Sequence, residues 1–233
     1  MKHAFFKPWV GKDYKNGLIN GKKVFILGAS FYCKKEECKY YEDCAINQNC
    51  IKYNKLCPHN NGRLLSNSAE GEIDEDGAIS YTRFFIFMRW VRSLCATENF
   101  DDFWDKVAFT NYVQHFIGVR KNTLPSDLRE DYLEMFVSVL DDFEKNKELP
   151  DVVIVWGHVI DKPLKYPYQG IPGHPECCIE IDEEKEGCVF YWKDFNGKDI
   201  IFINTFHPSY PKFYTDAEWN KMYLVFKSIF NLD

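Results

Sequence analysis

Polar side chains able to bind a ligand follow the short apolar stretches of this 233-residue chain. They are Ser30, Tyr32, Asn111, His158, His207 and Ser209. Hydroxyl, carboxamide and imidazole groups donate and accept hydrogen bonds, and their repeated placement after apolar stretches predicts a shared ligand pocket. A simpler interpretation stays open for each residue, since a histidine can belong to the core, Asn111 can cap a turn and Tyr32 can serve packing.

The apolar stretches themselves predict strands of a sheet that is buried on both faces. They cover residues 24–27, 107–113, 152–156 and 199–204. Short apolar runs rich in β-branched and aromatic residues are typical of central parallel strands. Gly28 and Gly157 follow two of these runs and predict the strand ends, where the backbone turns or approaches a ligand. We also expect a loop over 161–180 and a small extra strand over 188–192.

Helical patterns alternate with these strands. Apolar residues recur at helical spacing over 81–95 and 125–147, and a capping box at 215–218 opens a terminal helix. Helical crossovers between strands are right-handed and build parallel sheets, so we predict one α/β domain over residues 1–233. It is expected to be a three-layer α/β/α sandwich with a central four-stranded, mainly parallel sheet. The carboxyl ends of such strands share one edge, where ligands bind.

Several motifs along the chain occur in the order found in a known enzyme family. Residues 28–32 read Gly-Ala-Ser-Phe-Tyr, Asn111 follows an apolar run, Trp156 and Gly157 close another, and residues 207–211 read His-Pro-Ser-Tyr-Pro. This ordered set resembles the uracil-DNA glycosylase-like superfamily over nearly the whole chain. The first motif is similar to the Gly-Glu-Ser-His-Tyr motif of a divergent, uncharacterised branch of that superfamily.

The resemblance implies a DNA-repair-like N-glycosylase that excises a flipped nucleobase such as uracil. It implies that His207 donates a hydrogen bond to the leaving base anion, Asn111 pairs with a pyrimidine edge and Tyr32 lies beside the base ring. The other substrate-binding residues that it implies are Gly28, Ala29 and Ser209.

Ser30 is the catalytic position at which this chain departs from the well-known members of the superfamily, which have a water-activating aspartate there. A serine hydroxyl is a poor general base, so we expect any excision of uracil to be slow. Two alternatives stay open. One is a non-catalytic protein that binds a nucleobase or nucleic acid, and the other is a hydrolase of another small N-glycoside.

Five cysteines lie in a polar insert at about residues 33–63. They are Cys33, Cys38, Cys44, Cys50 and Cys57. Thiolates bind zinc and iron–sulfur clusters, and some members of the superfamily hold an iron–sulfur cluster on four cysteines. The insert has no Cys-x-x-Cys pair, so zinc, an iron–sulfur cluster and free thiols all stay open.

Composition limits the remaining function classes. The formal net charge of −6 gives no general electrostatic attraction to nucleic acid, so DNA or another nucleobase-containing ligand would bind at a local surface. No apolar run approaches the roughly 20 residues of a membrane span, and no apolar segment follows the first residues as in a signal peptide. We therefore expect a cytoplasmic, monomeric protein without membrane contact.

Overall fold

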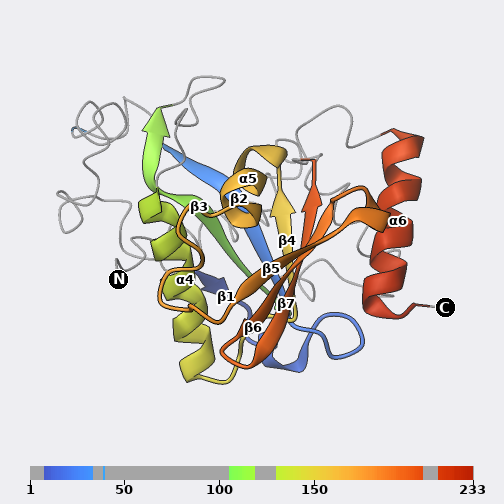
Figure 1. Cartoon of the computed structure of the whole chain (residues 1–233), viewed down its shortest axis with the longest axis horizontal. Coiled ribbons are helices and arrows are strands. Elements are labelled where there is room, and N and C mark those ends of the chain that lie inside the picture. Colours follow the sequence, from blue (N-terminus) through green and yellow to red (C-terminus); the bar gives the residue numbers. More distant parts are fainter. Residues whose placement is uncertain (1–7, 34–38, 40–104, 119–129, 207–214, 233) are drawn as a thin grey trace.

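The computed structural model describes residues 8–33, 39, 105–118, 130–206 and 215–232 (Figure 1). The strands are β1 (Trp9–Val10), β2 (Val24–Cys33), β3 (Val107–Gly118), β4 (Val152–Trp156), β5 (Cys178–Asp182), β6 (Val189–Phe195) and β7 (Lys198–Thr205). The helices are α4 (Glu130–Lys145), α5 (Asp161–Lys165) and α6 (Asp216–Phe230), with 3₁₀ turns η1 (Tyr14–Asn16), η5 (His158–Ile160) and η6 (Glu183–Lys185). The helix expected at 81–95 lies outside the described residues.

All seven strands form one sheet in the order β1-β3-β2-β4-β7-β6-β5. The central strands β3, β2, β4 and β7 are parallel neighbours, whereas β1, β6 and β5 pair antiparallel at the two sides. The α/β class is confirmed, but the prediction of a four-stranded, mainly parallel sheet is wrong, because the sheet is seven-stranded and mixed. The two outermost strands lack the apolar runs that mark central ones, since β1 has only two residues and β5 is exposed or half-buried along its length.

Helices cover both faces of this sheet (Figure 1). In β2, Phe25 and Leu27 belong to a core shared with α4 and α5, while Val24 and Ile26 belong to a second core shared with α6. Successive strand residues point to opposite faces. The apolar run of β2 is therefore unbroken because both of its faces are buried.

β2 continues through Gly28 as far as Cys33, so the prediction that Gly28 ends this strand is wrong. The outer part of β2 pairs with β3, from Ser30 opposite Val113 to Cys33 opposite Gly118. Asn111 consequently lies inside β3 and not at its end. This pairing joins segments far apart in the chain, so the local sequence pattern does not reveal how far either strand runs.

β4 and β7 end close to their predicted positions. Gly157 has a φ of 103°, a conformation that glycine adopts most readily, and it turns the chain from β4 into η5. β7 ends at Thr205, one residue beyond Asn204. Both ends lie at the same edge of the sheet, next to α5 (Figure 1).

The predicted helices and loops are partly corrected. α6 begins at the expected capping box, where Thr215 Oγ1 accepts a hydrogen bond from the Glu218 N–H at 3.3 Å. α4 lies within the predicted helix 125–147, and β6 confirms the extra strand predicted at 188–192. The predicted loop 161–180 instead contains α5 and the beginning of β5.

Among the described residues, no helix is both long enough and apolar enough to cross a membrane.

Candidate functional site at the carboxyl edge of the sheet

β2 and β4 pair in parallel in the middle of the sheet, from Val24 opposite Val152 to Leu27 opposite Val155. β3 is the other neighbour of β2, and β7 is the other neighbour of β4. The chain order of the parallel strands therefore runs outward in opposite directions from the β2–β4 pair, and the strand order reverses between β2 and β4. Ligands of open α/β sheets bind at the carboxyl edge where such a reversal occurs. We therefore take this edge of the sheet as the candidate site.

Asn111 lies opposite Gly28, and its side-chain amide rests against the Gly28 backbone. A Cβ atom at position 28 would lie 2.1 Å from Asn111 Oδ1, so only glycine leaves room for the amide. Asn111 is buried, and Gln114 Nε2 donates a hydrogen bond to its backbone carbonyl at 2.6 Å. The close contact with Gly28 places the amide over β2, one of the two strands that border the reversal.

Ser30 lies two residues beyond Gly28 on β2. Its side chain is therefore directed to the same face of the strand as the Asn111 amide. Its Oγ is buried and has no hydrogen-bond partner within the part of the chain that the structure describes. A buried hydroxyl without a partner is destabilising by about 1–3 kcal/mol, and such groups are retained where a ligand or water completes them.

His158 is the first residue of η5 and directly follows Gly157. Asn204 Nδ2 lies 2.9 Å from His158 Nδ1, and the imidazole meets the Phe206 ring edge-on with centroids 4.4 Å apart. Asn204 is 2% exposed, whereas His158 is exposed. The neighbouring strands β4 and β7 thus jointly fix an accessible imidazole at the candidate site.

Charged side chains around His158 affect its protonation. Partial burial lowers the pKa of His158 below its ordinary value, Lys165 and Lys221 lower it further, and Asp161 acts in the opposite direction. The imidazole is therefore mainly neutral at about pH 7. Because Asn204 Nδ2 is a donor, Nδ1 of the neutral ring accepts and Nε2 carries the proton.

The structure brings some of the predicted site residues together and separates one of them. Gly28, Ser30 and Asn111 lie on one face of the β2–β3 pair, whereas Ala29 packs against the core on the opposite face, beside α4. The backbone of Tyr32 extends β2, but its side chain is not among those described. His207 and Ser209 lie outside the described residues.

The predicted metal ligands are not tested by the described residues. Cys33 ends β2, and Cys38, Cys44, Cys50 and Cys57 lie outside the described part of the chain. Elsewhere in the described ranges, no three His, Cys, Asp or Glu side chains gather in a way that could hold a metal ion.

Sequence reasoning places His158 at this edge but does not foresee its contact with Asn204. The contact requires β4 and β7 to be neighbours, and the order of strands in the chain does not establish that. The available signal is the Gly157-His158 step at the end of a buried strand. It marks the position of a polar side chain but not its partner.

Comparison with models of known families finds none that matches this chain, and comparison with curated proteins finds no match either. The chemistry of the candidate site is therefore the basis for its function.

Proposed function

We propose that this chain is an N-glycosylase-like hydrolase that acts on a nucleobase, such as uracil, flipped out of DNA. The observation that supports the proposal best is the Asn111 amide, which is buried on a parallel sheet and held against Gly28 beside the strand reversal. A carboxamide offers one acceptor and two donors, so it can pair with the edge of a pyrimidine. Its close approach to β2 gives the amide one fixed position, which selective pairing requires.

The proposed reaction breaks the N-glycosidic bond through an oxocarbenium-like state while the base leaves as an anion. His207 is proposed to donate a hydrogen bond to a base oxygen and so stabilise the leaving anion. Asn111 is proposed to orient the base. Ser30 stands where a general base would activate the attacking water, and a hydroxyl of ordinary pKa does this poorly. Slow excision is therefore part of the proposal.

A second candidate is a non-catalytic protein that binds a nucleobase or nucleic acid with the same residues. Ser30 specifically favours it, because a buried hydroxyl can complete a hydrogen bond to a ligand without activating water. The two candidates share the contribution of Asn111 and differ only in bond cleavage. One assay can therefore separate them.

The deciding experiment measures release of bases from single-stranded and double-stranded oligonucleotides that contain uracil or other damaged bases. Wild type, His207→Ala and Asp142→Asn are compared in single-turnover reactions. Asp142 is a suitable control because its side chain is 65% exposed on α4. We expect slow release of a base by wild type and the control, and much less by His207→Ala.

The other outcomes are also informative. Binding of the oligonucleotide without release of a base supports the second candidate. Release from free nucleosides but not from oligonucleotides indicates a hydrolase of a small N-glycoside instead. If there is neither binding nor release, the proposal is wrong.

A further inference from the structure

His158 and Asn204 form a polar pair at the candidate site that the proposed reaction does not yet use. Asn204 is 2% exposed, and its Nδ2 lies 2.9 Å from His158 Nδ1. Its Oδ1 is also buried, and it has no hydrogen-bond partner among the residues that the structure describes. A buried carbonyl oxygen without a partner is destabilising and uncommon, so the pair is poorly explained by stability alone.

Asn204 determines which nitrogen of His158 can contact a ligand. Its amide donates to Nδ1, which leaves the Nε2–H as the remaining hydrogen-bonding group of the neutral ring. The edge-on contact with Phe206 restricts rotation of the ring. A histidine that is exposed, oriented and held in one tautomer is prepared to donate a hydrogen bond.

Partial burial favours the neutral form of this donor. Asp161 makes the largest charge contribution and favours the imidazolium, whereas Lys165 and Lys221 disfavour it. Asp161 is itself paired with Lys165, at 2.9 Å, and Lys221 is paired with Glu186, at 2.7 Å. A neutral N–H can stabilise negative charge that develops on a carbonyl oxygen, as neutral imidazoles do in other enzymes.

We propose that His158 is a ligand-binding residue of the candidate site and that Asn204 positions it to donate its Nε2–H to a carbonyl oxygen of a pyrimidine base. The identity of the base rests on the proposed function. The location rests on the end of β4, beside the reversal of strand order, and on the contact with β7. A pyrimidine such as uracil has two carbonyl oxygens, and either can accept a hydrogen bond from His158 Nε2.

The first test asks whether Asn204 sets the tautomer, and it needs no ligand. Nitrogen-15 NMR of the imidazole side chains, with His158→Phe to assign the signal, should show His158 neutral and protonated on Nε2 at about pH 7.5. Asn204→Asp has the same shape but only accepts hydrogen bonds, so it should move the proton to Nδ1 and raise the pKa of His158. Protonation on Nδ1 in the wild type would overturn the role of Asn204.

Asn204→Asp introduces a buried carboxylate, so its fold is checked by the dispersion of its amide spectrum. If this variant does not fold, Asn204→Ser provides the second test. Its shorter side chain should release His158, and the imidazole should then show a mixture of both neutral tautomers. A single Nε2–H tautomer in a folded Asn204→Ser variant would also overturn the role of Asn204.

The second test asks whether the donor contacts a base. Uracil should shift the Nε2 signal of His158, whereas inorganic phosphate at the same concentration should not. His158→Gln keeps an N–H near the Nε2 position and should bind uracil within about threefold of wild type, while His158→Phe keeps the ring and should bind about tenfold more weakly. A shift with phosphate but not with uracil would overturn the proposal.

The outcomes separate this proposal from the proposed function. If uracil shifts signals of other residues but not those of His158, the role of His158 is wrong and the proposed function stands. If neither uracil nor a uracil-containing single strand changes the spectrum, the proposed function and the base contact both fail.

Discussion

Gly28 and Asn111 face each other across the β2–β3 pair, and an alanine Cβ at position 28 would lie 2.1 Å from Asn111 Oδ1. Gly28→Ala must displace the buried amide, so we expect a loss of about 1–3 kcal/mol in the free energy of unfolding, measured by urea denaturation. Gly28→Ala is also measured in an Asn111→Ala background. In that background Gly28→Ala should be nearly harmless, because the clashing atoms are gone. Equal losses in both backgrounds would show that the Asn111 amide does not depend on Gly28.

In the proposed reaction, Ser30 occupies the position at which a carboxylate would activate water. Ser30→Asp should raise the single-turnover rate of uracil release, because a missing general base typically lowers a rate by about a hundredfold to ten-thousandfold. Ser30→Asn is the matched control, because asparagine has nearly the same size as aspartate but cannot act as a base. This variant should stay slow. If wild type already cleaves quickly, another residue activates the water. If neither variant gains activity and uracil binding is undetectable, the site serves a different ligand.

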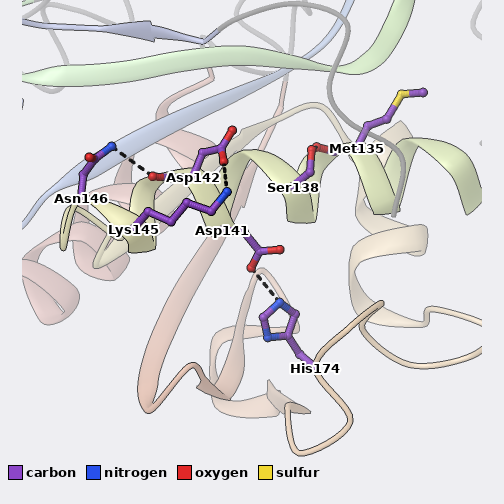
Figure 2. A network of polar contacts seen from close by, with 7 residues as sticks. All are labelled: Met135, Ser138, Asp141, Asp142, Lys145, Asn146 and His174. Atoms are coloured by element: carbon purple, nitrogen blue, oxygen red, sulfur yellow. Dashed lines mark hydrogen bonds and ion pairs between the residues drawn. The ribbon is translucent and has the colours of Figure 1, made fainter.

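At the scale of elements, one hydrogen bond connects α4 to the segment between α5 and β5 (Figure 2). His174 Nε2 lies 2.9 Å from Asp141 Oδ1, and its ring stacks on Phe195 with centroids 4.0 Å apart. The His174 side chain is 10% exposed. His174→Phe keeps the stacking but loses the hydrogen bond, so we expect a loss of about 1 kcal/mol in the free energy of unfolding.

A neighbouring ion pair on the same helix is the control for this prediction (Figure 2). Lys145 Nζ lies 2.6 Å from Asp142 Oδ1, but both side chains are largely exposed. Exposed pairs contribute little because water screens them, so Asp142→Asn should leave the urea midpoint almost unchanged. If Asp142→Asn destabilises the protein as much as His174→Phe does, burial is not what makes the His174–Asp141 contact stronger.

The sequence predicts the elements whose burial leaves a local pattern and misses those that depend on distant pairing. The four central strands follow from their apolar runs, and α6 follows from its capping box. β5 was not predicted because residues 178–182 have no apolar run and form the outermost strand of the described sheet, paired with β6. In the candidate site, local pattern points to Ser30 and Asn111 as polar residues near strand ends. The approach of Asn111 to Gly28 depends on the β2–β3 register, which no local pattern contains.

At the scale of the whole molecule, His158 should make stability depend on pH. Partial burial lowers its pKa in the folded state; Asp161 opposes this shift and Lys165 and Lys221 add to it. The unfolded chain has the ordinary value of about 6.5. The unfolded state therefore binds more protons between these two values. The contribution of neutral His158 is complete above about pH 6.5 and is lost as the pH falls toward the folded pKa.

The measurement is the urea midpoint of wild type and His158→Phe across this pH range. The wild type should lose more stability than His158→Phe as the pH falls from about 7 to 5. Three carboxyls of the described residues have a lowered pKa through hydrogen bonds from lysines, so they act at lower pH: Asp199 with Lys193, Glu186 with Lys221 and, despite its desolvation, Asp182 with Lys185. Parallel profiles for the two proteins would contradict the prediction.

The chain has nine cysteines, and Cys177 and Cys188 are buried in the described part of the structure, outside the cysteine-rich insert. Burial raises the pKa of Cys177 to about 11 and also raises the pKa of Cys188, so both thiols stay protonated and react slowly with thiol reagents.

Cys33 ends β2 at the carboxyl edge of the sheet and begins the cysteine-rich insert. If that insert binds a metal, protein purified without oxygen should contain zinc or iron near stoichiometry. Replacing Cys33 and Cys50 together with serine should remove the metal, while Cys178→Ser, an exposed cysteine outside the insert, should retain it. Chelation should expose additional reactive thiols in the wild type but leave Cys177 and Cys188 unreactive, because the core that buries them is built from other residues. If the protein contains no metal and chelation does not change the number of reactive thiols, the cysteines of the insert are free thiols.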